Sequence, residues 1–457
     1  MASIAQSPIG TTTEKINKPF SATTISLPLV SIISEKLIKP SSPTPPTKRW
    51  HKLSLIDQAF SNSYIPFSLF YTKQQLDAIS KNNNPTQISH LLEESLSKIL
   101  STYYPYAGRL KDNTVVDCND TGAEFIEVQI SCPISQTLNW HNSAVEDLLF
   151  PQGLPWSNSA DRGLVVVQLS YFSCGGIAIS MCISHKTGDG CSGYNLFRDW
   201  SEITSDPNFS KPSLHYVEQS IFPPLSSGPF LSPLFMSNKH DCVQRKYIFS
   251  NEKLLNLKNK VAAESEVQNP TRTEVVSALI FKRAVAAAKA NLGFFQPSSM
   301  VQAVDLRAQI GLPPNAIGNL LTICPTSIIT EQSMTISKLV SEIRKSKELA
   351  YNKDNINDNI FVALLLELAN SKQEYHDNGP NAYQITSLVK FALHEIDFGW
   401  GKPTKVSIAN GLNNKLAILM GNQSGGLDAF VTLSEQDMSV FERDPELLEF
   451  ASLVPSC

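Results

Sequence analysis

Apolar residues recur along the chain with two different periods, which predicts a mixture of strands and helices. A short apolar segment at 176–183, preceded by a pair of glycines, predicts a buried strand. Residues 191–203 follow it with aromatic side chains three positions apart, which predicts an amphipathic helix. Residues 91–100 also place apolar side chains on one helical face, whereas residues 124–130 alternate as a strand with one exposed face does.

A similar rhythm returns in the second half of the chain. Ser250 can cap a helix, and Thr271 with Glu274 forms a capping-box sequence that opens a long Ala-rich helix to about Asn291. Further elements are expected as helices near 336–343 and 360–368 and as strands at 383–391, 406–409, 416–420 and 427–433. Helices and strands are interspersed in both halves, which predicts the mixed α/β class.

The length of 457 residues predicts two domains, because a chain of this size exceeds one ordinary core. Residues 1–24 are rich in Ser and Thr and are expected to form a disordered extension. We place an N-terminal domain at 25–205 and a C-terminal domain at 241–457. Residues 206–240 are interrupted repeatedly by proline, which indicates a crossover between the domains.

Composition narrows the class of protein. The formal net charge of -4 gives no basic surplus of the kind that nucleic-acid binding shows. No apolar stretch is long enough to span a bilayer, so we expect no membrane partner and a cytoplasmic location. The 8 cysteines have no C-x-x-C spacing, which argues against a zinc site and fits a reducing compartment.

The most informative stretch follows the predicted strand at 176–183. His185 stands at the strand end, and Asp189 follows between two glycines in a turn. Such strand-end loops often carry catalytic residues, and a neutral imidazole is well suited to take a proton from an alcohol. A lone histidine can equally be a packing or surface residue. Asp189 could orient His185 as a dyad, or it could turn away and pair with an arginine.

Two other signatures are weaker. Gly188, Gly190 and Gly193 match the dinucleotide-binding spacing, but an aspartate inside that loop would repel a pyrophosphate. Asp397-Phe-Gly resembles the kinase metal-binding triplet, but the other kinase motifs do not precede it. A rigid turn whose Trp400 packs between the domains is the simpler interpretation.

Together, two distant motifs point to one family. The stretch His185-Lys-Thr-Gly-Asp189-Gly190 and the stretch Asp397-Phe-Gly-Trp-Gly401 resemble the paired signatures of plant BAHD acyltransferases. The likeness covers nearly the whole chain after residue 30 and looks most like the vinorine-synthase-type branch. Further matching stretches are Leu53–Asp57, Tyr104–Leu110, Phe172–Gly176, Thr273–Ala278, Val304–Arg307 and Gly318-Asn319.

The resemblance implies an α/β fold of two chloramphenicol-acetyltransferase-like domains, each with a mixed sheet, and a channel between them. Acyl-CoA and the acceptor alcohol would enter this channel from opposite sides and meet at the histidine. Members of the family commonly exchange a strand segment near the second motif between domains.

The resemblance also implies roles for individual residues. His185 is the expected catalytic base. The expected structural residues at the site are Asp189 with its partner Arg307, and Gly190, Asp397 and Trp400. Thr386 and Ser387 are expected to face the reacting carbonyl, although Leu388 follows them where many members have tryptophan. Contacts to the CoA are expected from Lys258 and Ser277.

The function expected from this resemblance is acyl-CoA-dependent O-acylation, most simply transfer of acetyl from acetyl-CoA to a hydroxyl of a plant specialised metabolite such as an alkaloid. No metal and no permanently bound cofactor are expected, and the enzyme should be a monomer. The alternative is a catalytically silent homologue that binds acyl-CoA or another ligand on the same fold.

Overall fold

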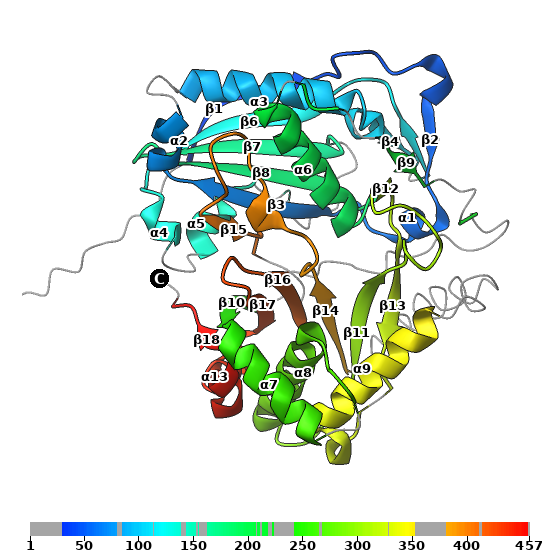
Figure 1. Cartoon of the computed structure of the whole chain (residues 1–457), viewed down its shortest axis with the longest axis vertical. Coiled ribbons are helices and arrows are strands. Elements are labelled where there is room, and N and C mark those ends of the chain that lie inside the picture. Colours follow the sequence, from blue (N-terminus) through cyan, green and yellow to red (C-terminus); the bar gives the residue numbers. More distant parts are fainter. Residues whose placement is uncertain are drawn as a thin grey trace, which may run out of the picture.

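Two large β-sheets, one above the other in Figure 1, organise the described part of the chain. The computed structural model describes residues 30–79, 85–112, 114–138, 143–151, 154, 162–206, 208–210, 213–217, 222–223, 242–264, 267–327, 329–351, 381–410 and 414–455. The expected extension at 1–24, the helix expected at 360–368 and most of the crossover at 206–240 lie outside these residues.

The first sheet is mixed. In spatial order its strands are β1 (Val30–Ile38), β6 (Ala123–Ile130), β7 (Val165–Phe172), β8 (Ile177–Ser184), β3 (Tyr64–Tyr71) and β15 (Lys405–Ser407). Strands β6 and β7 run parallel, and the other neighbours in this sheet are antiparallel. Helices α3 (Pro85–Leu100) and α6 (Gly190–Ser205) cover one face, and α4 (Ser135–Leu138) and α5 (Ser143–Asp147) lie at the other (Figure 1).

The two elements that flank His185 form where the sequence predicts them. The apolar run becomes β8, which is buried along its whole length between β7 and β3. The aromatic spacing after it becomes α6, whose buried Phe197 and Trp200 pack into the core beneath α3. The helix expected at 91–100 forms as part of α3, with Leu92, Leu96, Ile99 and Leu100 fully buried on one face.

The exposed face expected for residues 124–130 is largely wrong, because β6 is buried on both faces except at Gln129, which is exposed, and Glu124, which is half-buried. Its Phe125 enters the core under α3, and the alternate residues Ile126 and Val128 enter the core on the α5 side. Glu127 is buried as well, since Ser34 and Tyr171 donate hydrogen bonds of 2.7 and 2.9 Å to its carboxylate. A polar residue in an alternating pattern therefore lies inside here, because neighbouring elements supply hydrogen-bond donors.

The second sheet is built mainly from the C-terminal half. In spatial order its strands are β13 (Leu321–Pro325), β11 (Ser298–Asp305), β14 (Asn381–Ser387), β16 (Leu416–Gly421), β17 (Leu427–Ser434), β10 (Cys242–Phe249) and β18 (Ser452–Leu453). Its outer face is covered by α7 (Asn251–Glu264), α8 (Arg272–Leu292), α9 (Ile336–Tyr351), α12 (Glu435–Phe441) and α13 (Pro445–Phe450) (Figure 1). The capping box at the start of α8 forms as expected, between Thr271 and Glu274.

The two halves share apolar packing. Along β16, Ala417 and Leu419 face the helices of the second sheet, while Ile418 and Met420 enter the core of the first. Strand β15 comes from the C-terminal half yet pairs antiparallel with β3. Lys405 of β15 is tied there by a 2.5 Å contact to the buried carboxylate of Glu146. The strand exchange that the family resemblance implies is thus present.

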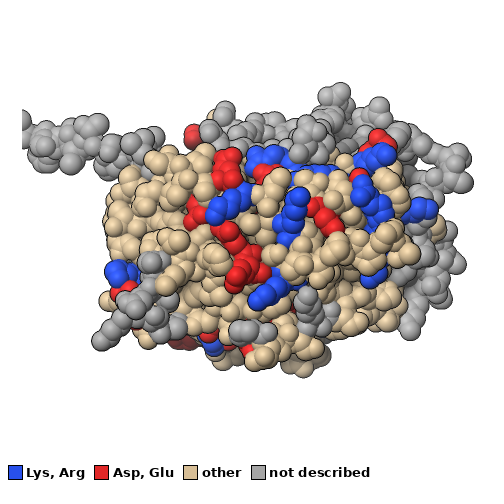
Figure 2. Space-filling model, turned by 90° about the horizontal axis from the view of Figure 1, so that it is seen from above, with Lys and Arg blue, Asp and Glu red and all other residues tan. Residues whose placement is uncertain are grey.

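Shorter elements join these layers. They are α1 (Leu55–Ala59), α2 (Lys73–Ile79), the small sheet of β2 (Trp50–Lys52), β5 (Val115–Asp117) and β4 (Arg109–Lys111), and the parallel pair β9 (His215–Tyr216) and β12 (Ala316–Ile317). Figure 2 shows acidic and basic side chains intermixed on the face seen from above Figure 1. Within the described ranges, no helix is both long and apolar enough to cross a membrane.

Candidate active site

The loop between β8 and α6 holds His185 by its backbone. The His185 amide donates to the carbonyl of Ser63 at 2.8 Å, just beyond the end of α1. Asp189 caps α6, since its side chain accepts from the Ser192 amide at 2.9 Å. A short loop pinned at both ends keeps the His185 side chain in one place, half-buried at the strand end.

The His185 ring is oriented by Asn319, in the loop before β13. The His185 Nδ1 lies 3.1 Å from the Asn319 Oδ1. The Asn319 Nδ2 donates to two acceptors, the Asp57 carboxylate at 2.9 Å and the His185 carbonyl at 2.7 Å. Because both acceptors require the amide nitrogen, the Asn319 oxygen must face Nδ1, and Nδ1 must carry the proton. Among the described residues Nε2 has no partner, so its lone pair can accept a proton.

Burial keeps this imidazole neutral. The ring of Phe60 stacks on the His185 ring, with centroids 4.2 Å apart and an interplanar angle of 10°. Burial lowers the pKa of His185 below its usual 6.5, and this outweighs the opposite influence of the Asp189 charge. At neutral pH the side chain is therefore unprotonated, which is the state that a general base requires.

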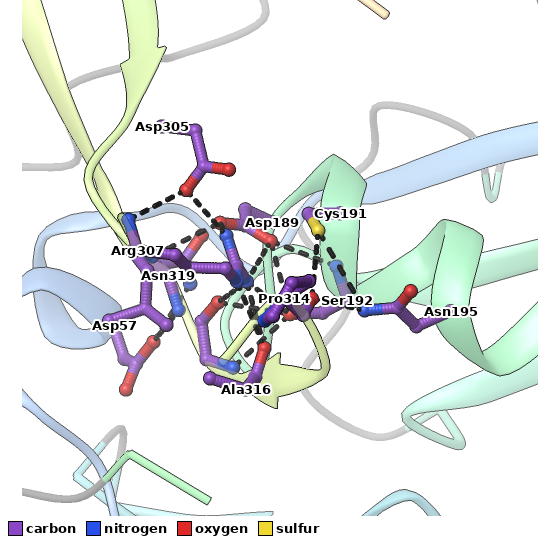
Figure 3. A network of polar contacts seen from close by, with 12 residues as sticks. Asp57, Asp189, Cys191, Ser192, Asn195, Asp305, Arg307, Pro314, Ala316 and Asn319 are labelled. Carbon is purple, nitrogen blue, oxygen red and sulfur yellow. Dashed lines mark hydrogen bonds and ion pairs between the residues drawn. The ribbon is translucent and has the colours of Figure 1, made fainter. Parts of the chain in front are cut away.

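The Asp189 carboxylate faces Arg307, which follows β11 (Figure 3). The guanidinium meets both carboxylate oxygens, with Nη1 to Oδ2 at 2.9 Å and Nη2 to Oδ1 at 2.9 Å. The Leu320 amide donates to the same carboxylate at 3.1 Å. Burial alone would raise the pKa of Asp189, but the charge and hydrogen bonds of Arg307 lower it below its usual value.

Arg307 ties the loop that carries His185 to the second sheet. Its guanidinium also donates to the Ala316 carbonyl at 3.0 and 3.1 Å, and it bonds Asp305 at 3.0 Å. The side chains of Asp189 and Arg307 are almost wholly buried, whereas that of Asp305 is 41% exposed. This network joins α6 to the loops that follow β11 and precede β13 (Figure 3).

The end of β14 lies beside the same loop. A Cβ added at Gly190 would meet Leu388 and Phe391, each at 3.3 Å, so these side chains pack on the start of α6. Thr386 and Ser387 immediately precede Leu388 and are half-buried. The strand expected at 383–391 ends at Ser387, because a turn follows in which the Phe391 amide donates to the Leu388 carbonyl.

The second motif forms a separate group. Asp397 accepts hydrogen bonds from the Gly399 and Gly401 amides at 2.7 and 2.8 Å, and both glycines have positive φ. The loop they shape presents Trp400 to Tyr71 of β3, with ring centroids 5.9 Å apart and planes at 90°. These contacts hold the loop on the core of the first sheet and do not reach His185.

The two expected CoA contacts lie on the outer helices of the second sheet. Lys258 is half-buried on α7. Ser277 of α8 is fully buried, and its hydroxyl accepts a hydrogen bond from Gln302 at 3.0 Å. The structure brings neither residue into the group around His185, and the CoA contacts stay predictions. In the part of the chain that is described, no cluster of His, Cys, Asp or Glu could hold a metal ion.

Sequence reasoning assigned no role to Asp57, Asn319 or Phe60, although Asp57 and Asn319 stand in stretches that match the family. Asn319 lies 134 residues from His185 and 262 from Asp57. A buried aspartate in a capping box was the available signal, because its second oxygen needs a donor from elsewhere.

Comparisons with known proteins identify the family of this chain. The model of the Transferase family matches residues 29–448. The chain is 45% identical to acyltransferase Pun1 of Capsicum frutescens over 437 residues, covering 92% of this chain and 98% of that protein. It is 33% identical to deacetylvindoline O-acetyltransferase of Catharanthus roseus over 441 residues, covering 92% and 97%.

Solved structures show the same fold. The crystal structure of vinorine synthase matches with a TM-score of 0.79 and 29% identity, covering 93% of this chain and 99% of that one. TRI101 of F. sporotrichioides, complexed with coenzyme A and T-2, matches in fold with a TM-score of 0.67 and 17% identity, covering 88% and 99%. The chain therefore belongs to the Transferase family of plant acyltransferases, the BAHD family, and is an acyltransferase.

Proposed function

We propose that this enzyme transfers an acetyl group from acetyl-CoA to a hydroxyl group of an alkaloid or a similar specialised metabolite, with His185 as general base. The observation that carries the proposal is the 3.1 Å contact between the His185 Nδ1 and the Asn319 Oδ1. Asn319 holds the proton on Nδ1, and Nε2 keeps a free lone pair on a neutral ring.

The proposed reaction needs two proton transfers through one nitrogen. Nε2 of His185 takes the proton of the acceptor hydroxyl as its oxygen bonds to the thioester carbonyl carbon. The tetrahedral intermediate then collapses, the carbon–sulfur bond breaks, and the imidazolium returns its proton to the departing CoA thiolate. Thr386 or Ser387 is proposed to donate a hydrogen bond to the oxyanion, a contribution of about 3 kcal/mol.

Asp189 and Arg307 are proposed to serve as supports rather than as reactants. Both carboxylate oxygens of Asp189 are occupied by Arg307 and by backbone donors, and the Nδ1 of His185 is occupied by Asn319. Gly190, Asp397 and Trp400 are proposed to shape the surrounding loops. This division of roles leaves His185 as the group that touches the substrate.

The donor and acceptor classes are inferred from relatives. Deacetylvindoline O-acetyltransferase is named for acetyl transfer to oxygen, and TRI101 is complexed with coenzyme A. We propose CoA contacts at Lys258 and Ser277, a cytoplasmic monomer, and a domain division near 206–240 with β15 exchanged. Size-exclusion chromatography with light scattering tests the monomer directly.

The test begins with acetyl-CoA and a pooled set of alcohols, with acetylated products identified by mass spectrometry and CoA release measured with a thiol reagent. His185→Ala should lower kcat by roughly 10²–10⁴ with folding intact. His90→Ala is the matched control, because His90 is exposed on α3 beside Glu94. Near-normal turnover by His185→Ala would contradict the proposed mechanism. Binding of acetyl-CoA without CoA release would favour the silent homologue instead.

A further inference from the structure

Lys186, directly after His185, is buried in a way that the proposed mechanism does not explain. Its side chain is 1% exposed and is among the largest fully buried side chains of the described residues. Its Nζ donates to the Gln58 carbonyl at 2.7 Å and to the Phe60 carbonyl at 2.6 Å. Burying an ammonium group is unfavourable unless its hydrogen bonds are made, so these contacts indicate a defined role.

The carbonyls that Lys186 holds belong to the end of α1. The last carbonyls of a helix have no partner within it and need donors from elsewhere. Lys186 supplies such donors and so fixes the point at which the chain leaves α1 at Phe60. This is the residue whose ring stacks on His185. His185 and Lys186, which are adjacent in sequence, therefore both contact Phe60. His185 stacks on its ring, and Lys186 donates to its carbonyl.

Helix α1 also reaches His185 by a second route. Asp57 accepts from the Asn319 backbone amide at 2.8 Å and from its side chain at 2.9 Å, and Asn319 holds the Nδ1 of His185. The position of α1 thus sets both the stacked face of the imidazole and the partner of its Nδ1. A shift of α1 would move both contacts together.

We propose that Lys186 is a positioning residue for the acyl-transfer reaction, which acts by clamping the end of α1 so that Phe60 and Asn319 hold the His185 ring in its reactive orientation. The inference rests on the proposed role of His185 as base. A misplacement of about 1 Å at a catalytic group can lower a rate by about 10²-fold, so the clamp matters even though Lys186 touches no substrate.

The charge of Lys186 makes the clamp sensitive to pH. Burial lowers the pKa of Lys186 to about 8, and the nearby Asp57 carboxylate opposes this by favouring the ammonium form. Asp57 of α1 is the charged group that acts on Lys186. His185, which precedes Lys186 in the sequence, is neutral near pH 8 because the pKa of its imidazole is below 6.5. The neutral amine still donates, but its bonds to the carbonyls are roughly half as strong.

Loss of the Lys186 proton should lower activity without lowering the stability of the fold. Because the pKa of Lys186 is lower in the folded protein than the usual 10.5, losing its proton above pH 8 does not destabilise the fold. We expect kcat/KM to rise with pH through the His185 titration below pH 6.5. It should then fall by about tenfold, with its midpoint near pH 8, to a lower plateau at higher pH, while the melting temperature shows no matching fall.

The experiment uses the full-length enzyme, acetyl-CoA and the pooled alcohol that gives the fastest CoA release. Lys186→Met should lower kcat by about 10–100-fold, leave KM for acetyl-CoA within about threefold, and abolish the alkaline limb. Lys186→Arg, which stays charged, should lose the alkaline limb and keep more activity. Lys405→Met is the matched control, because it removes a buried lysine that bonds Glu146 away from His185.

A double variant tests whether Lys186 acts through His185. Adding Lys186→Met to His185→Ala should leave the residual rate unchanged, because no positioned base remains to be misplaced. The inference would be overturned if adding Lys186→Met to His185→Ala lowered the residual rate by the same factor as Lys186→Met lowers the wild-type rate. A near-normal kcat in Lys186→Met would also overturn it. If Lys186→Met does not fold, the wild-type profile decides, and the absence of an alkaline limb overturns it. Retained turnover in His185→Ala alone would instead contradict the proposed function.

Discussion

Removing the Asp189 carboxylate should destabilise the fold far more than removing the other carboxylate that Arg307 binds. In Asp189→Ala the guanidinium stays buried and keeps only the partly exposed carboxylate of Asp305 as a counter-charge, since the Arg307 side chain is 3% exposed. Breaking a buried pair from one side costs about 3–5 kcal/mol, and the lost N-cap of α6 accounts for about 1 kcal/mol of this. Asp305→Ala breaks a bond of 3.0 Å to the same guanidinium, but Asp305 is 41% exposed and should contribute about 0–1 kcal/mol.

The free energy of unfolding is measured by urea denaturation at 25 °C, followed by tryptophan fluorescence for wild type and both variants. A third variant combines Asp189→Ala with Arg307→Met, which removes the stranded charge and should recover more than about 1 kcal/mol. Equal losses for Asp189→Ala and Asp305→Ala would refute the reasoning, because the two sites differ chiefly in burial. Lost activity with wild-type stability in Asp189→Ala would instead favour a direct catalytic role.

Two further predictions concern the same loop. Asn319→Ala should lower kcat by about 10–100-fold, because the Nδ1 proton of His185 loses its acceptor. The resulting tautomer shift is measurable by ¹⁵N NMR of labelled histidine, and an unchanged spectrum would contradict this prediction. Gly188→Ala should lower the free energy of unfolding by about 1–3 kcal/mol, because the added Cβ would lie 2.6 Å from the Tyr106 hydroxyl. Gly421→Ala is the control, because its added Cβ would meet its nearest atom at 3.5 Å. Equal midpoints of urea denaturation for the two variants would contradict the predicted clash.

Local sequence patterns were sufficient to predict several of the helices and strands, including those that flank His185. The apolar run predicted strand β8, the aromatic spacing predicted α6, and the capping box predicted the start of α8. Each of these signals depends on residues within a few positions of one another, and so the chain carries them before any tertiary contact forms. The position of His185 at a strand end followed from the same local pattern.

The partners of these residues were decided by the tertiary structure. Periodicity indicates which face of a strand is apolar but not what covers the other face. For this reason one face of β6 was expected to be exposed, whereas Phe125 and Glu127 on that face are buried and only Gln129 is exposed. Lys186 looks like a surface residue in a turn, yet its burial depends on carbonyls 126 and 128 residues earlier. The tautomer of His185 likewise depends on Asn319, which only the packing of the two sheets brings to it. The sequence by itself determined the elements and the candidate base, whereas the fold decided what holds that base in place, because hydrogen-bond partners far apart in the chain are chosen by packing.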